Sequence, residues 1–211
     1  QWWREELDKL ADGRPSHPLS LAVQTVANRH PLPLKPFFQM ADQVEAEIRR
    51  RPLPDSAALV HACDADLGAL FELMARCHSL TDPDHIASAR AIGAFCALVY
   101  RIRDSGWLAR QGRVPIPLDL LGPHHLTPDA LREGQHRARL VEWLPELARQ
   151  AQALQARSAH FRALPPFARV HARILANLLR EIEALSFQVV DQQLSLTPLR
   201  KLWIAWRETW R

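Results

Sequence analysis

Apolar residues recur every three or four positions along nearly the whole 211-residue chain, in stretches separated by proline. This spacing places them on one face of an α-helix, and proline marks the breaks because it lacks the backbone N–H that a helix interior needs. The β-branched residues that favour strands are scarce, since Val, Ile and Thr total only 23. The pattern therefore predicts an all-α protein, a single bundle of about eight helices.

The proline breaks and capping residues set the bounds of the predicted helices. In the first half of the chain, helices are expected at residues 2–11, 19–28, 35–50, 56–77 and 84–111. After a loop at 112–126, helices are expected from Thr127-Pro128 to about Gly134, then on to Leu164 with a kink at Pro145, at 167–190, and at 199–211. The third and fourth helices each carry one apolar face. In the fourth helix this face is Leu59, Cys63, Leu67, Leu70, Met74 and Cys77.

The charge of the chain is mildly basic. A net charge of +4 comes mainly from 24 arginines with three lysines, and these cations are scattered, so no nucleic-acid partner is indicated. The longest apolar run, residues 91–100, is about half as long as a membrane-spanning helix, and no signal peptide is visible. The composition thus argues against a nucleic-acid-binding or membrane-spanning protein.

The three cysteines, Cys63, Cys77 and Cys96, form no Cys-x-x-Cys pair, and each lies on the apolar side of a helical pattern. We interpret them as small core residues of a protein in a reducing compartment. The predicted location is therefore the cytoplasm, or a membrane surface on its reducing side.

Local motifs for catalysis or metal binding are weak. Two carboxylate pairs have the i,i+4 spacing of one helix face: Asp8 with Asp12, and Glu142 with Glu146. We interpret both pairs as solvated surface charges. His124-His125 has no further ligands at zinc spacing, and no P-loop or nucleophile elbow is present.

Three segments, in order along the chain, resemble the squalene/phytoene synthase family. Residues 91–95 and 100–117 resemble its second aspartate-rich region, in which a helix ending in N-x-x-R-D-x-x-x-D leads into an A-R-x-G-R loop. Residues 3–18 resemble its W-R-x-E-L…G-x-P…H-P stretch, and 196–202 its C-terminal signature. The chain is identified on these motifs as a member, with 1–211 as one domain that lacks the family's opening helices.

The resemblance implies a class I isoprenoid synthase fold. Members join two prenyl diphosphates head to head, and Mg²⁺ ions bridge the departing pyrophosphate to two aspartate-rich helices that face each other across a cavity. By resemblance, Arg103, Arg110 and Arg113 fall on basic positions that bind diphosphate. The alternative for these arginines is pairing with Asp104, Asp119 and helix carbonyls.

The second aspartate motif of this chain departs from the family pattern. Asp104 matches the first metal-binding aspartate, but Leu108 stands at the position of the second, Trp107 at a frequently acidic position and Tyr100 at the asparagine. Asp104 is thus a residual metal ligand by resemblance. Asp64 and Asp66, on the helix that lines the family's cavity, are candidate polar features of that cavity whose side chains diverge at i,i+2 spacing.

Two functions remain open on these residues. In the first, the protein is a non-catalytic or altered homologue that keeps the cavity for an isoprenoid or lipid ligand, or serves a protein partner, and no cofactor is expected. In the second, it is an active prenyl transferase that uses Mg²⁺. Leu108 favours the first function, and the intact loop from Ala109 to Arg113 favours the second.

The last predicted helix is amphipathic. Leu199, Leu202, Trp203, Trp206 and Trp210 form one stripe, and arginines and a lysine occupy other positions of the helix. Tryptophan beside arginine is typical of a helix that lies at a membrane surface, so Trp203, Trp206 and Trp210 are candidates for peripheral membrane contact. The alternative is that the stripe packs onto the bundle.

Overall fold

The computed structural model describes residues 2–30, 32–114, 116–121, 127, 129–130 and 137–210. Over these residues the regular structure is entirely helical, which confirms the predicted fold class. The helices are α1 (Trp2–Ala11), α2 (Pro18–Ala27), α3 (Lys35–Ile48), α4 (Ser56–Cys63), the π-helix η1 (Asp64–Gly68), α5 (Ala69–Cys77), α6 (Pro83–Arg110), α7 (Leu118–Leu121), the 3₁₀ helix η3 (Arg137–Glu142), α9 (Leu144–Ala156), the 3₁₀ helix η4 (Phe161–Ala163), α10 (Pro166–Ala184) and α11 (Pro198–Thr209).

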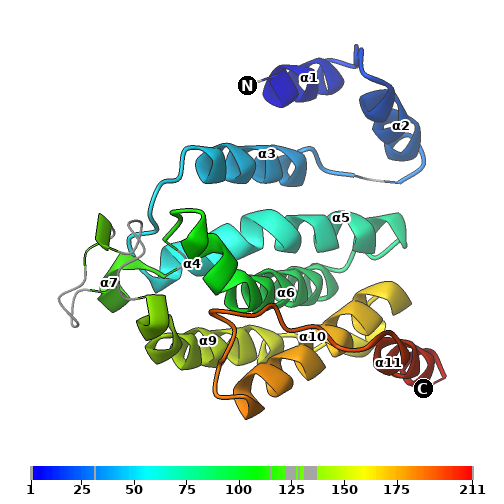
Figure 1. The fold of residues 1–211 in the computed structure, drawn as a ribbon. Helices are drawn as coiled ribbons and strands as arrows, with labels where there is room; N and C mark the ends of the chain where they lie inside the picture. Colours follow the sequence, from blue (N-terminus) through cyan, green and yellow to red (C-terminus); the bar gives the residue numbers. More distant parts are fainter. Residues whose placement is uncertain are drawn as a thin grey trace.

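The 28-residue helix α6 runs through the centre of the molecule (Figure 1). It starts where the Asp82 side chain accepts hydrogen bonds from the backbone N–H groups of Asp84 and His85, with Pro83 in the first turn. Because α5 and η1 pack on one side of α6 and α9 and α10 on another, most of its middle turns are buried. A helix of this length, about 42 Å, spans the whole bundle.

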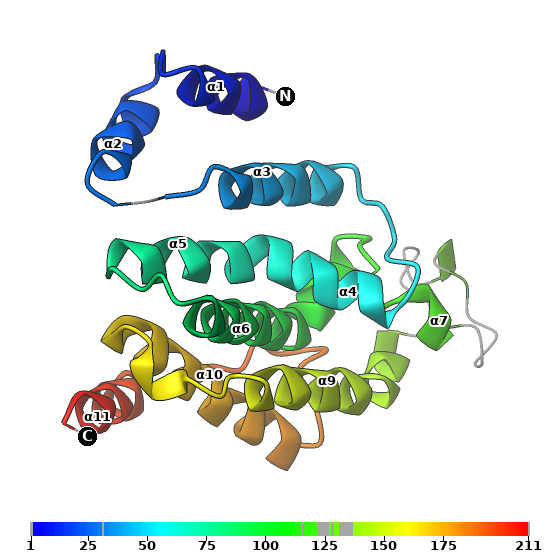
Figure 2. The same ribbon diagram turned by 180° about the vertical axis from the view of Figure 1, so that it is seen from behind.

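The other helices form layers on either side of α6. Both views show α3 lying over α5, and α9 and α10 on the opposite side of α6 (Figures 1 and 2). Helices α1 and α2 lie at one edge, beyond α3, while α11 lies at the other edge against α10. The main buried cluster is built from α4 onward, so α1 and α2 contribute nothing to it among the described residues.

The N-terminal motif has a structural role. Glu6 is buried, and its carboxylate accepts hydrogen bonds from the backbone N–H groups of Ser16 (2.7 Å) and His17 (2.6 Å) and from the Ser16 hydroxyl (2.7 Å). These bonds, above all that from the Ser16 hydroxyl, lower the pKa of Glu6 from its ordinary value of 4.5 to about 2. The matched W-R-E-E-L…H-P stretch therefore holds the α1–α2 turn together.

The predicted helix 56–77 is interrupted by the π-turn η1, which the periodicity did not indicate. A π-turn contains one extra residue, so it rotates the face that the following helix turns toward the core. Helix α5 accordingly buries Phe71, Leu73 and Ala75, while Leu70 of the predicted face is exposed.

The cysteine prediction is correct at two positions and wrong at the third. Cys63 and Cys96 are buried, and burial raises the pKa of the Cys63 thiol to about 11 and also raises that of Cys96. Cys77 is exposed, because it follows the π-turn and therefore lies on the rotated face of α5.

The C-terminal helices are shorter than predicted. Helix α9 ends at Ala156 rather than Leu164, and Pro145 stands in its first turn, so it does not kink the helix. Helix α10 ends at Ala184 rather than near Val190, because Ser186 and Phe187 adopt positive φ angles of 50° and 58°.

Among its described residues, the loop at 112–126 contains the short helix α7. The helix predicted from Thr127-Pro128 lies largely outside the described residues, although the Ala130 N–H donates to the Thr127 hydroxyl at 3.2 Å, as expected of a cap. His124 and His125 also lie outside the described residues. In the part of the chain that is described, no helix combines the length and apolarity that crossing a bilayer requires.

Candidate functional site

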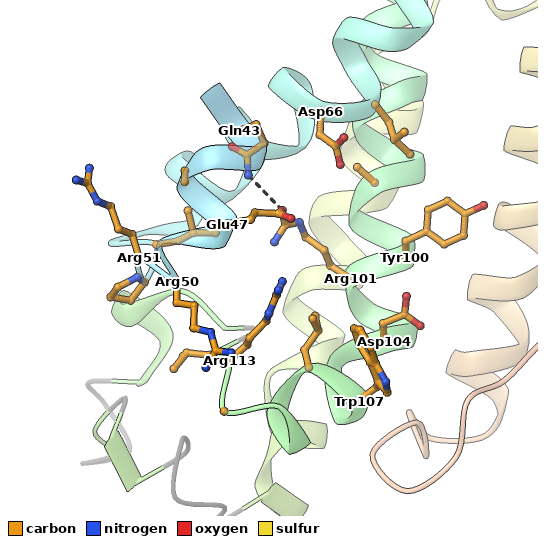
Figure 3. Close-up of a pocket in the computed structure, with 18 residues that line it drawn as sticks. Gln43, Glu47, Arg50, Arg51, Asp66, Tyr100, Arg101, Asp104, Trp107 and Arg113 are labelled. Carbon is orange, nitrogen blue, oxygen red and sulfur yellow. Dashed lines mark hydrogen bonds and ion pairs between the residues drawn. The ribbon is translucent and has the colours of Figure 1, made fainter. Parts of the chain in front are cut away.

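A cavity of about 570 Å³ opens between α3, η1 and the C-terminal half of α6 (Figure 3). Its walls mix apolar and charged side chains. The lining residues are Gln43, Ala46, Glu47, Arg50, Arg51, Pro52, Leu53, Asp66, Leu67, Ala97, Tyr100, Arg101, Asp104, Trp107, Leu108, Gly112, Arg113 and Val114.

The π-turn η1 decides which aspartate reaches the cavity. Asp66 lines it, and burial followed by the charge of Glu47 raises the pKa of the Asp66 carboxyl. Asp64 points elsewhere and accepts from Arg90 Nε at 3.0 Å, in a network that also includes Glu72. The predicted divergence of the two aspartates is therefore confirmed.

Asp104 lies at the cavity but its carboxylate is already engaged. Arg103 donates to both oxygens, from Nε to Oδ1 at 2.8 Å and from Nη2 to Oδ2 at 2.7 Å, and Gln193 Nε2 donates to Oδ1 at 2.7 Å. The guanidinium carbon of Arg103 also lies 4.6 Å from the centroid of the Tyr100 ring. Arg103 itself is not among the lining residues, because it is folded back onto Asp104.

The residues around Asp104 do not fit a Mg²⁺ site. Magnesium requires an octahedral shell of oxygen atoms, and the Leu108 and Trp107 side chains supply none. The Tyr100 hydroxyl is hydrogen-bonded to His171 Nε2 at 3.1 Å. Across the described ranges, no group of three or more His, Cys, Asp or Glu side chains is arranged to hold a metal ion.

The cavity wall facing α3 is rich in arginine. Figure 3 shows Arg50, Arg101 and Arg113 on this side of α6, whereas Tyr100 and Asp104 point to the other side. Arg101 forms an ion pair with Glu47, which also accepts from Gln43. Arg50 and Arg113 form no ion pair with any described residue, and the buried Arg113 Nε has no hydrogen-bond partner there. This wall therefore carries unpaired positive charge.

The Gly112 turn places Arg113 at the cavity. Gly112 has a φ of +68° and ends α6 in a Schellman motif, in which the Gly112 N–H donates to the Ala109 carbonyl and the Arg113 N–H to the Leu108 carbonyl, both at 3.0 Å. Glycine adopts this left-handed conformation without steric cost. The A-R-x-G-R loop thus turns the chain so that Arg113 points back over the end of α6.

Arg110 is directed to a different part of the molecule. It donates a hydrogen bond to the Val190 carbonyl oxygen. The backbone at Val190 passes close to α6, because a Cβ on Gly106 would lie 2.0 Å from the same oxygen. Of the three predicted diphosphate-binding arginines, only Arg113 lines the cavity. A diphosphate role for Arg103 and Arg110 stays a prediction, and Arg103 shows the predicted alternative pairing with Asp104.

The carboxylate pairs away from the cavity are solvated, as predicted. Asp8 on α1 and Asp12 in the turn after it are exposed, and Asp12 pairs with Arg14. Glu142 and Glu146 pair with Arg139 and Arg149, respectively, at the protein surface.

The tryptophan stripe of the last helix lies on α11 and is exposed. The alternative that the stripe packs onto the bundle is therefore wrong, because α11 contacts α10 through another face on which Ile204 is the one buried residue.

Two cavity residues were not anticipated from the sequence. Glu47 and Arg50 lie at the end of α3, outside the segments that carry the recognised motifs. Arg50 has a φ of +52°, a left-handed conformation that is uncommon for a residue other than glycine. The one available signal was the run Arg49-Arg50-Arg51 before Pro52, which marks a helix end rich in cations.

An all-helical bundle around such a cavity is the architecture that the sequence motifs implied. The squalene/phytoene synthase family profile matches residues 1–200, so the chain belongs to this family. It is 25% identical over 138 residues to phytoene synthase 1, chloroplastic, of Zea mays, covering 63% of this chain and 34% of that protein. It is also 25% identical over 146 residues to phytoene synthase of Arthrospira platensis, covering 63% and 47%. The chain therefore spans less than half of the length of these curated relatives.

Solved structures share the fold. A dehydrosqualene synthase in complex with ligand superposes with a TM-score of 0.78 at 21% identity, covering 97% of this chain and 75% of that one. Squalene synthase HpnC from Alicyclobacillus acidocaldarius superposes with a TM-score of 0.74 at 19% identity, covering 87% and 72%. The class I isoprenoid synthase-like fold predicted from the motifs is thereby confirmed.

Proposed function

We propose that this protein is a non-catalytic or altered squalene/phytoene synthase homologue that binds a prenyl-diphosphate-type isoprenoid ligand through arginine rather than through Mg²⁺. The observation that carries the proposal is the state of the second aspartate motif. Asp104 is held by Arg103 and Gln193, and its metal-binding partner position is Leu108. Unpaired guanidinium groups of Arg50 and Arg113 line the same cavity.

The cavity suits both parts of such a ligand, the prenyl chain and the diphosphate. Leu53, Leu67, Ala97, Leu108 and Val114 form the apolar part of its lining, which suits a prenyl chain. Guanidinium groups match phosphate oxygens with paired N–H donors, and the unpartnered Nε of Arg113 offers one such donor. A volume of about 570 Å³ also lies in the usual range for small-molecule sites, about 300–1,000 Å³.

The replacement of a carboxylate by Leu108 bears on catalysis. Charge develops on the departing pyrophosphate, and groups aimed at such charge typically contribute about 3–4 kcal/mol each to lowering a barrier. Leucine offers no charge at this position, so the expected consequence is loss of synthase activity.

An active, Mg²⁺-dependent prenyl transferase is the second candidate. The observation that favours it is the intact Gly112–Arg113 turn at the cavity, together with Asp104 in the lining. In this case Asp104 has to leave Arg103 and Gln193 before it can serve as a ligand. Any product, and the length of the prenyl chain, belong to the same proposal.

Pyrophosphate release from farnesyl diphosphate by the full-length protein with Mg²⁺ separates the two candidates. The proposal expects no release above the protein-free background by the wild type. Leu108→Asp restores the missing carboxylate, so release by this variant alone would locate the loss at position 108. Turnover by the wild type well above background would overturn the proposal and establish the second candidate.

Ligand affinity is tested separately with two arginine variants. Arg113→Gln removes a guanidinium from the cavity and is expected to weaken farnesyl diphosphate binding about tenfold or more. Arg49→Gln is the matched control, because Arg49 lies next to Arg50 at the end of α3 but does not line the cavity and pairs with Glu45 instead. Equal effects of the two substitutions, or no measurable binding by the wild type, would argue for a protein partner instead.

A further inference from the structure

Helix α11 presents an apolar surface that the rest of the described chain leaves uncovered. Five large apolar side chains of α11 and its C-cap are exposed: Leu199 by 79%, Leu202 by 66%, Trp203 by 54%, Trp206 by 58% and Trp210 by 78%. At 3.6 residues per turn they fall within an arc about 100° wide, so they form one continuous face, which we term the α11 stripe. The opposite face holds α11 against α10 through the buried Ile204.

Cations border the α11 stripe, while the acidic group of the helix is turned away from it. Arg200 and Arg207 lie on one flank, and the Arg207 guanidinium carbon is 5.2 Å from the centroid of the Trp203 ring. Arg207 has no carboxylate partner among the described residues, whereas Arg200 pairs with Glu181. Glu208, the acidic residue of α11, is engaged by Arg169 and Arg173 of α10 at 3.3 Å each.

We propose that the α11 stripe binds the surface of a lipid bilayer that contains anionic phospholipid. Tryptophan and leucine enter the boundary between headgroups and acyl chains, and a bordering arginine meets the phosphate groups. The 12 residues of α11 make a rod about 18 Å long, which lies in the plane of the interface rather than across it.

Charge complementarity selects this occupant over a second copy of the chain. An isologous contact between two stripes would bring the Arg207 side chains of both copies to the same interface without a carboxylate to neutralise them. An anionic bilayer supplies that neutralising charge. The C-terminal turns of α6 line the cavity, and both ribbon views place α11 at the opposite end of the bundle from α7, the helix that follows α6, so docking leaves the cavity free (Figures 1 and 2).

Vesicle flotation with the full chain tests the proposal. We expect the protein to float with phosphatidylcholine vesicles that contain about one third phosphatidylglycerol, and much less with phosphatidylcholine alone, because the cations require an anionic surface. The triple substitution Trp203→Ser, Trp206→Ser and Trp210→Ser is expected to lower the partition coefficient about tenfold or more. Arg207→Glu is expected to lower binding to the anionic vesicles only.

Two controls keep the test decisive. Trp2→Ser removes an indole that is 51% exposed but lies on α1, and it is expected to leave flotation unchanged. Helical circular dichroism and the thermal midpoint establish that each variant is folded. The proposal is overturned if the wild type does not float, if the triple variant floats equally well, or if light scattering shows a wild-type dimer that the triple variant converts to monomer. No isoprenoid is present, so the result is independent of the function proposed for the cavity.

Discussion

Leu108 and Asp104 occupy successive turns of α6, at the two positions where the family resemblance predicts carboxylates. Two carboxylates at this spacing repel each other unless a cation lies between them. With leucine at position 108, the Asp104 carboxylate is the one negative charge at these two positions. Arg103 and Gln193 donate hydrogen bonds to it from within the protein. Under the predicted assignment of positions 104 and 108 as metal ligands, the leucine removes one ligand and also allows the other to be engaged by neighbouring side chains.

The left-handed backbone at Arg50 costs free energy in the folded state. A φ of +52° costs a non-glycine residue roughly 1–2 kcal/mol in the folded state. Glycine avoids this cost, but it also makes the unfolded chain more flexible, and the higher entropy of the unfolded state offsets part of the gain. We predict that Arg50→Gly raises the free energy of unfolding by about 0.5–1 kcal/mol. The same substitution is expected to weaken farnesyl diphosphate binding, measured by calorimetry, because a cavity guanidinium is lost.

Ser79 provides the control for this prediction. It ends α5 with a φ of +62° and does not line the cavity, so Ser79→Gly should stabilise the fold without changing affinity. If Arg50→Gly stabilises the protein and binds farnesyl diphosphate as tightly as the wild type, Arg50 is not a ligand-binding residue.

The lowered pKa of Glu6 determines how the free energy of unfolding is expected to depend on pH. Because its pKa in the folded state, about 2, is below its ordinary value of 4.5, the unfolded chain binds the proton more readily. The stabilisation is thus fully present above pH 4.5 and is lost as the pH falls toward 2. We expect Glu6→Gln to lower the thermal midpoint at pH 7, and the difference from the wild type to shrink at pH 3.

Asp8→Asn serves as the control for Glu6→Gln, since Asp8 is an exposed carboxylate on the same helix. A difference between wild type and Glu6→Gln that stays constant from pH 7 to pH 3 would contradict the role assigned to the Glu6 carboxylate.

At the scale of single residues, the sequence identified one side of the cavity. Asp104, Leu108 and Arg113 were found because they belong to one contiguous motif. Arg50 and Glu47 were not found, because they reach the cavity only through the packing of α3 against α6 across the fold. A sequence motif identifies residues that are close together in the chain. The cavity wall between α3 and α6 is instead formed by residues about 50 positions apart, such as the Glu47–Arg101 ion pair.

Among the elements, the π-turn η1 has the largest effect on the site. It gives Asp66 and Asp64 different surroundings, one in the cavity and one beside Arg90. Apolar spacing did not reveal it, because the apolar residues from Leu59 to Cys77 also fit the period of an uninterrupted α-helix. Proline breaks, in contrast, predicted the starts of α4, α6 and α11 to within one residue.

The Gly112 turn links the end of α6 to the position of Arg113. We predict that Gly112→Ala lowers the free energy of unfolding by about 1–2 kcal/mol, because alanine is strained at this φ. The same variant is expected to weaken farnesyl diphosphate binding, since relaxation of the turn displaces Arg113. Urea unfolding and calorimetry measure the two effects.

Gln111→Ala is the control for the Gly112 prediction, because Gln111 precedes the turn without a positive φ. A stable Gly112→Ala variant with wild-type affinity would show that the Schellman motif does not position Arg113.

Across the whole molecule, the core is distributed unevenly. The buried cluster runs from α4 to α11, whereas α2 buries only Ser20. Because local stability follows buried apolar contacts, we predict that amide hydrogens of α1 and α2 exchange much faster than those in the middle of α6. Hydrogen exchange monitored by mass spectrometry measures this directly, and equal protection in all helices would contradict the arrangement.

The two proposed surfaces of the molecule are far apart. The C-terminal turns of α6 line the cavity, whereas helix α11, which carries the α11 stripe, lies at the other end of the bundle from α7 (Figures 1 and 2). The all-helical class and the family were predictable because periodicity and motif order are properties of the chain itself. Exposure of the α11 stripe was not, since only the packed structure shows which face of the helix meets α10.

The function proposed for this protein requires that arginine, and not Mg²⁺, holds a diphosphate in the cavity. Calorimetric titration of the full-length protein with farnesyl diphosphate, once in EDTA and once with Mg²⁺, tests it most directly. We expect saturable binding in EDTA with an affinity that Mg²⁺ leaves unchanged, and loss of that affinity in Arg113→Gln. Binding that requires Mg²⁺, or binding in EDTA that Arg113→Gln does not weaken, would contradict it.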